Sequence, residues 1–345
     1  MTATDIDQLL HRHVLFWRQG AVDRPLVGKV PTTRLEPKPY PVRGGRELID
    51  PTPLRPQDVD VDRLVGADRA PGQLLIGDLI QPAGCVYPEA WMESLIGCPI
   101  MASAYGVVAQ PVGLSLAEAL DGFSIEAALQ SGWAGIMDSV LLRQREVFGQ
   151  SLPVRQLHQR GIIDMLAACL GEVQLCTCAL DQPRLLEELA DRFAELYFLV
   201  ANRGLTMRAP WHGGYVSVWN VYAPRPVLDY QVDASSLFSS ALYEKCFLKC
   251  DRRVLSQFPY CVIHVHACGL HILDALLKLD ELSAVQIRLD RETGIWEKER
   301  VLACCKNVQK CSKSLIVTGE LTEDELAEFL SALRPEGLAI YYWNP

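Results

Sequence analysis

Short apolar runs alternate with longer amphipathic stretches from about residue 73 to the end of the chain. The runs have strand length, and the stretches between them repeat apolar residues at intervals of three and four, as helices do. Strands separated by helices in this order favour parallel pairing through helical crossovers. The predicted strands are 73–80, 99–112, 173–180, 215–222, 260–267, 284–289, 314–319 and 337–343.

This order predicts an α/β fold, and the length of the chain fits a (β/α)₈ TIM barrel. A doubly wound open sheet is the alternative, but the chain has no glycine-rich phosphate turn after a strand to favour it. The predicted helices are 124–148, 182–204, 235–258 and 322–334; serines open the third, and Thr322 with acidic residues in the first turn opens the fourth.

The first part of the chain has a different pattern. An amphipathic segment at 6–17 leads into a stretch rich in proline and arginine. Prolines at this density exclude long helices and central strands. We therefore expect residues 1–70 to be an irregular N-terminal extension that wraps a barrel domain formed by residues 71–345.

Composition narrows the classes of function. Hydrophobic residues make up 49% of the 345 residues and charged residues 22%, which is typical of a globular chain. The net charge of −9 argues against nucleic acid as a partner. No apolar run reaches membrane-span length, and the N-terminus lacks the apolar core of a signal peptide. We expect a cytoplasmic protein that does not bind membranes, in which most of the twelve cysteines are free thiols.

The segment CVIHVHACGLHILDALL, residues 261–277, carries the clearest candidate chemistry. In a strand, alternate side chains share a face, so His264, His266 and Cys268 lie together if the strand runs that far. In a barrel this face points inward and reaches the mouth at the strand ends, and Gly269 stops the strand. Imidazole and thiolate are preferred zinc ligands. The alternative is that these are core side chains satisfied by hydrogen bonds.

Polar and aromatic residues near other predicted strand ends are candidates for the same mouth. Asp78 follows an apolar run, and Asp233 precedes a helix start, so we expect both to face the mouth and orient polar substrate groups. Asp233 also fits a helix cap, and the aromatic candidates fit simple packing equally well. The predicted substrate-binding side chains are Tyr87, Trp91, Tyr215, Trp219, Gln231 and Gln286.

Three segments resemble the uroporphyrinogen decarboxylase superfamily. YCVIHVHACGLHILDALLKLDELSAVQI (260–287) resembles its histidine strand, glycine, helix and following strand. DYQVDASSLFSSALYEKCFLKCDRR (229–253) and VTGELTEDELAEFL (317–330) resemble the units before and after it. The likeness covers roughly 73–340 and implies a (β/α)₈ barrel with its site at the strand C-termini.

Two branches of this superfamily differ in their motifs. The decarboxylases have an arginine-rich segment that binds substrate carboxylates. This chain has no counterpart of that segment, and Arg43 and Arg46 resemble it only weakly. The corrinoid-linked methyltransferases have a zinc motif His-x-Cys-Gly, which residues 266–269 match, followed by a distant cysteine that the last strand, 337–343, lacks. The resemblance implies zinc bound by His266 and Cys268. In place of the distant cysteine we expect His264, or a cysteine from another strand end, as third ligand; His264 is alternatively a general acid/base.

The predicted function is therefore zinc-assisted methyl or alkyl transfer involving a thiol or corrinoid partner. One alternative is a metal-independent decarboxylase or lyase acting on a carboxylated small molecule. The other is a non-catalytic protein that binds a small molecule, a corrinoid or a metal. In each case we expect a small-molecule ligand, with a corrinoid protein as a candidate partner; the sequence leaves the oligomeric state open.

Overall fold

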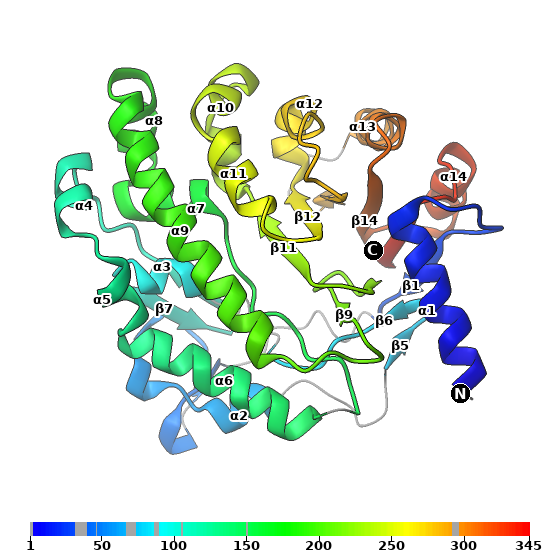
Figure 1. The fold of residues 1–345 in the computed structure, drawn as a ribbon, viewed down its shortest axis with the longest axis horizontal. Helices are drawn as coiled ribbons and strands as arrows, with labels where there is room; N and C mark the ends of the chain where they lie inside the picture. The colour runs from blue at the N-terminus through cyan, green and yellow to red at the C-terminus, as the bar shows by residue number, and fades with distance from the viewer. Residues whose placement is uncertain are drawn as a thin grey trace.

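The computed structural model describes residues 3–31, 40–45, 47–66, 74–85, 90–104, 106–149, 151–291 and 297–345. Its centre is a six-stranded sheet in which every neighbouring pair is parallel (Figure 1). The strands, in spatial order, are β1 (Leu26–Lys29), β15 (Leu338–Trp343), β14 (Ser314–Glu320), β13 (Ala284–Arg288), β12 (Tyr260–Val265) and β11 (Val227–Gln231). The α/β class with a parallel sheet is thus confirmed.

Both faces of the sheet are buried, which explains why its strands read as continuous apolar runs. One face packs against the surrounding helices through residues such as Leu228, Ile263, Val285, Val317 and Ile340. The opposite face forms a second apolar cluster through Val227, Val262, Ala284, Ile316 and Ala339, which is closed at one end by Phe16 and Trp17 of α1. Further along β11, β12, β13 and β14, this second face becomes polar, with Gln231, His264, Gln286 and Thr318.

The helices lie outside the sheet (Figure 1). Four of them have a serine N-cap and one a threonine N-cap, Thr322, whose hydroxyl accepts the backbone N–H of Glu325. The helices are α1 (Ala3–Arg18), α2 (Val61–Gly66), α3 (Trp91–Leu95), α4 (Leu116–Gly122), α5 (Ile125–Leu129), α6 (Gly132–Phe148), α7 (Ile162–Leu170), α8 (Glu172–Asp181), α9 (Pro183–Met207), α10 (Ser240–Cys246), α11 (Leu248–Leu255), α12 (Leu273–Leu276), α13 (Lys298–Lys310) and α14 (Glu323–Ala332).

A regular eight-stranded barrel is not confirmed. In the described residues, irregular segments rather than ladder strands connect β1 to β11. The Asp78 N–H donates to Val27 O at 2.8 Å, and Ala83 forms an isolated parallel bridge with Val154. The chain then passes so close to β11 that a Cβ at Gly161 would lie 2.0 Å from the Gln231 carbonyl oxygen. Two irregular segments therefore lie where two barrel strands are expected.

Several predicted strands have a different structure. Residues 173–180 lie in α8, because Leu175, Cys178 and Ala179 are buried at helical spacing. The predicted strands 73–80, 99–112 and 215–222 fold back as antiparallel hairpins: β5 (Leu75–Ile76) with β6 (Leu79–Ile80), β7 (Ile100–Ser103) with β8 (Gly106–Ala109), and β9 (Tyr215–Val216) with β10 (Tyr222–Ala223). The remaining short strands are β2 (Tyr40–Pro41), β3 (Glu47–Leu48) and β4 (Thr52–Leu54), which pairs with β7.

The N-terminal part of the chain is joined to the main sheet. β1 pairs with β15, with Leu26 opposite Ala339, and the Trp17 indole N–H donates to Tyr222 O at 2.7 Å. Among the described residues, no single helix is both long and apolar enough to cross a membrane; α7 and α8 meet that criterion only as a pair, which is bent by 108°.

One buried carboxylate lies among the helices rather than at the sheet ends. Asp251 of α11 accepts the hydroxyl hydrogens of Tyr230 and Tyr243, both at 2.5 Å. Burial raises the pKa of Asp251 to about 6, although the two hydroxyl donors oppose that rise.

Candidate metal centre

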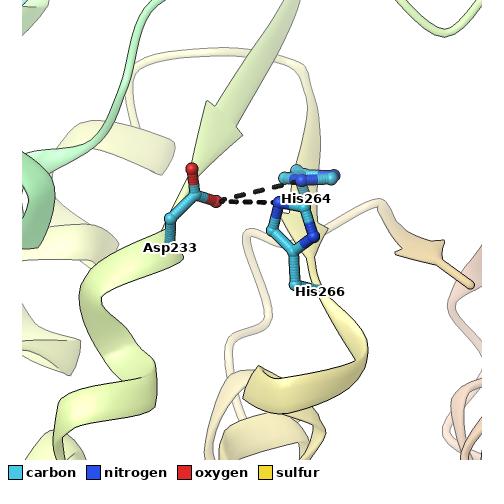
Figure 2. A group of neighbouring side chains, drawn as sticks. All are labelled: Asp233, His264 and His266. Atoms are coloured by element: carbon cyan, nitrogen blue, oxygen red, sulfur yellow. Dashed lines mark ion pairs between the residues drawn. The ribbon is translucent and has the colours of Figure 1, made fainter. Parts of the chain in front are cut away.

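Asp233, His264 and His266 come together where β11 and β12 end (Figure 2). His264 lies on β12 opposite Gln231 of β11, and Asp233 begins the short 3₁₀ helix η4 (Asp233–Leu237) just beyond that strand. One ligand atom from each side chain lies within 4.8 Å of the other two. The Nε2 atoms of both histidines lie 3.8 Å from the same oxygen, Asp233 Oδ1.

Hydrogen bonding fixes the tautomer of His264. The amide of Gln286 donates through Nε2 to Thr318 Oγ1 at 2.5 Å, so its Oε1 faces the ring and accepts the hydrogen on His264 Nδ1. The Nε2 lone pair is then directed toward Asp233. Trp219 lies flat on the imidazole, with ring centroids 5.1 Å apart and planes 16° apart, and shields it from water.

His266 is held in an equivalent way by a carboxylate. Its Nδ1 lies 2.8 Å and 3.0 Å from the two oxygens of Asp290, which also accepts the backbone N–H of Ala267 at 2.7 Å. Nδ1 therefore carries a hydrogen, and Nε2 faces Asp233. A histidine whose second nitrogen donates to a carboxylate or amide is the usual arrangement around protein-bound metals.

The surroundings shift the pKa values of the two imidazoles in opposite directions. Burial, together with the nearby charge of His266, lowers the pKa of His264 to about 3, so this ring is neutral and its Nε2 can act as a ligand. Burial also lowers the pKa of His266, but the hydrogen bond to Asp290 and the charges of Asp233 and Asp290 outweigh it and raise the pKa above the ordinary value.

Asp233 is positioned through its backbone. Its own N–H and that of Ala234 donate to the carboxylate of Asp164, at 3.3 Å and 2.7 Å. Burial and the charge of Asp233 raise the pKa of Asp164 to about 6. Asp233 Oδ1 is buried, and it has no hydrogen-bond partner among the residues that the structure describes.

A guanidinium group lies on the other side of Asp233. Arg160 Nε is 3.7 Å from Asp233 Oδ2, while Arg160 Nη1 donates to Glu93 Oε1 at 3.0 Å. Burial lowers the pKa of Arg160, but the charges of Asp164, Glu93 and Asp233 outweigh it, so the pKa is raised and the group stays a cation. Burial raises the pKa of Glu93, and Arg160 opposes that rise.

Two imidazole nitrogens and a carboxylate oxygen are a donor set that suits zinc or a similar divalent ion. The unpartnered, buried Asp233 Oδ1 is the atom that such an ion would satisfy. The residues present therefore fit a metal ion, with Gln286 and Asp290 as the groups that orient its ligands.

Cys268 does not belong to this group. β12 ends at Val265 and the chain turns into the 3₁₀ helix η5 (Ala267–Ile272), so the strand alternation that would place Cys268 beside the histidines stops short of it. Its side chain is exposed, and the three-residue cluster in the described part of the chain does not include its sulfur. In the cluster of possible metal ligands, Asp233 stands beside the two histidines where the Cys268 thiol was predicted.

Asp78 lies at the other end of the sheet. It occupies the turn between β5 and β6, forms ion pairs with Arg12 and Arg24, and accepts the N–H of Val27 at the start of β1 at 3.1 Å. Asp233 follows the end of a parallel strand, so the structure does not bring these two carboxylates to the same mouth.

The predicted substrate-binding residues divide into three groups. Trp219 and Gln286 contact His264, and Gln231 hydrogen-bonds to His158 near it. Trp91 is 2% exposed within the main apolar core, and Tyr215 lies against the second cluster with Arg208 over its ring. Tyr87 lies outside the described residues.

Asp290, Asp164, Arg160 and Glu93 were not among the residues that the sequence analysis assigned to the site. Asp290 had a detectable signal, because it directly follows β13, the neighbour of the histidine strand. The other three come from residues 91–95 and 160–164, which carry no strand-end pattern. Only folding brings them to Asp233.

Comparison with known proteins finds similar solved structures but no match in sequence. No family model and no curated protein matches the chain. Among solved structures, the fold is similar to that of a methyltransferase from Methanosarcina mazei, with a TM-score of 0.61 and 15% identity, over 96% of this chain and 92% of that chain. At this identity the likeness shows a shared fold.

Proposed function

We propose that the protein is an enzyme that transfers a methyl or other alkyl group with the help of a zinc ion held by Asp233, His264 and His266. The observation that carries this proposal is the convergence of their three ligand atoms within 4.8 Å, with both histidine Nδ1 atoms already engaged. Both Nε2 atoms face the same carboxylate oxygen, Asp233 Oδ1, at 3.8 Å.

Two independent likenesses support methyl transfer as the reaction. Residues 266–269 resemble the His-x-Cys-Gly motif of corrinoid-linked methyltransferases, and the chain has the fold of a methyltransferase. Bound zinc supplies a Lewis acid that lowers the pKa of a thiol to near neutrality. A thiol substrate held there would lose its proton to solvent, and its sulfur would form the new bond to the methyl group as the bond between methyl and donor breaks, with the electron pair of that bond staying on the donor.

The residues of the chain have distinct roles in this proposal. The two Nε2 atoms and Asp233 Oδ1 bind the cation. Gln286 and Asp290 keep the imidazole hydrogens on Nδ1, and Trp219 excludes water from one face of His264. A methylcobamide is the proposed methyl donor, and it would act as a substrate at the same mouth.

Metal analysis tests the first part of the proposal. Protein purified without chelators is expected to contain about one zinc ion per chain by elemental analysis. His266→Ala and Asp233→Asn should lose it, whereas His11→Ala, which removes an exposed histidine on α1, should retain it. A wild-type protein that neither contains nor takes up zinc would contradict the assignment.

Absorbance spectroscopy tests the second part. Zinc-loaded protein mixed with methylcobalamin and 2-mercaptoethanol should demethylate the corrinoid, which changes its visible spectrum, and His266→Ala should not. If zinc binds but neither the spectrum changes nor a methyl thioether forms, methyl transfer from this corrinoid to this thiol is contradicted, and the decarboxylase and non-catalytic alternatives gain support.

A further inference from the structure

Glu93 is a buried carboxylate that the proposed reaction does not use. It lies on α3, its side chain is 0% exposed, and its Oε2 has no hydrogen-bond partner among the residues that the structure describes. Burying a carboxylate is costly unless it is paired. Arg160 Nη1 donates a hydrogen bond of 3.0 Å to Glu93 Oε1. A role for Glu93 is therefore sought through Arg160.

Arg160 lies between Glu93 and the candidate metal centre. Its Nη2 is 3.5 Å from Asp164 Oδ1 and its Nε is 3.7 Å from Asp233 Oδ2. The second distance is too long for a hydrogen bond, and Arg160 Nε has no hydrogen-bond partner among the described residues. The guanidinium therefore stops short of Asp233 although its Nε–H is unused.

Asp233 does not depend on Arg160 for its place in the fold. Two backbone N–H groups, those of Asp233 and Ala234, attach this turn to Asp164. Asp233 Oδ1 has no hydrogen-bond partner among the described residues, so the guanidinium and a cation beside the histidines can compete for the charge of this carboxylate. Because guanidinium–carboxylate pairs with direct hydrogen bonds are strong, a closer Arg160 would draw Asp233 away from that cation.

We propose that Glu93 is a positioning residue that holds the Arg160 guanidinium back from Asp233 and so leaves the Asp233 carboxylate to the metal ion. This role rests on the metal centre proposed above. It also explains why a carboxylate on α3 is buried where a neutral side chain would pack at less cost. Glu93 acts through Arg160 and does not touch the metal ligands.

A double-mutant cycle on zinc affinity tests the proposal, with competition against a chromophoric chelator as the measurement. Glu93→Gln removes the charge that pairs with Arg160 and leaves only a weaker amide acceptor, so the guanidinium can move toward Asp233. Zinc binding should then weaken by roughly tenfold or more, since a charge-assisted hydrogen bond has to be broken. Arg160→Met removes the competing cation and should bind zinc at least as tightly as the wild type. Glu93→Gln combined with Arg160→Met should restore the affinity of Arg160→Met alone.

The sign of the coupling separates this role from a structural one. If Glu93 only supported the packing of α3, the double variant would bind zinc as weakly as Glu93→Gln or more weakly, and that result overturns the proposal. Unchanged zinc affinity in Glu93→Gln overturns it too. The matched control is Glu188→Gln, which removes an exposed Glu188–Arg192 pair on α9 and should change nothing.

Two further measurements cover the remaining cases. If Glu93→Gln does not fold, Arg160→Met alone decides, because weaker zinc binding in that variant contradicts competition. If the wild type binds no zinc, the proposed function fails. A crystal structure of metal-free Glu93→Gln then tests separately whether Glu93 keeps Arg160 away from Asp233. That structure should show Arg160 Nε within hydrogen-bond distance of Asp233 Oδ2; an unmoved guanidinium overturns the inference.

Discussion

Asp290→Asn is the most informative single change at the candidate metal centre. Asp290 accepts hydrogen bonds from His266 Nδ1 and from the backbone of Ala267. It also has a left-handed backbone, with φ of 46°, which asparagine adopts more readily than other residues. The substitution therefore keeps the turn and removes the carboxylate charge and one of these two acceptor oxygens.

The expected effect on zinc affinity follows from these contacts. Groups that orient a metal-binding imidazole typically contribute 10- to 100-fold to affinity, which is about 1.4–2.7 kcal/mol. The effect should fall within this range, because Asp290 is 5% exposed and lies 2.8 Å from the ring nitrogen, while the 33% exposure of His266 lets solvent screen the interaction only in part. His266 itself is retained, so binding should weaken without disappearing.

Chelator competition at pH 7.5 measures the affinity directly. Asp324→Asn, which changes an exposed aspartate on α14, is the control for removing one negative charge, and it should bind zinc like the wild type. The reasoning is refuted if Asp290→Asn binds zinc as tightly as the wild type while His266→Ala does not bind, because His266 would then need no orienting partner.

Two further substitutions test parts of the fold outside this site. Asp78→Asn breaks the ion pairs with Arg12 and Arg24 at the far end of the sheet. It should lower the free energy of unfolding by about 1–3 kcal/mol and leave zinc affinity within about twofold of the wild type. A large loss of zinc affinity would contradict the placement of Asp78 away from the metal centre. The raised pKa of Asp251, about 6 against an ordinary 3.8, means that its protonated form favours the folded state; this stabilisation is complete below pH 4 and is lost as the pH rises through 6. From pH 4 to pH 7, urea denaturation should therefore show the wild type losing about 2 kcal/mol relative to Asp251→Asn, and equal pH slopes would refute the burial argument.

Local patterns were reliable where a strand is buried on both faces. Strands 260–267, 284–289, 314–319 and 337–343 correspond to β12, β13, β14 and β15, within two residues at each end. The same apolar signal was ambiguous at 173–180, where burial every three to four residues makes a helix, and in the three predicted strands that fold back as hairpins. Short runs carry too few positions to separate these periods.

The sequence by itself predicted that His264 and His266 point to the same side of the chain, since alternation is a local property. In the structure His264 lies in β12, and His266 directly follows its last residue, Val265. The sequence could not determine where that alternation stops, and the turn after Val265 removes Cys268 from the pair. The partners of the histidines were decided by tertiary structure alone. Asp233 meets them because parallel β11 and β12 end at the same edge of the sheet. Glu93 comes near the site through the packing of α3 against α7, and residues so far apart in sequence cannot be paired from a local pattern.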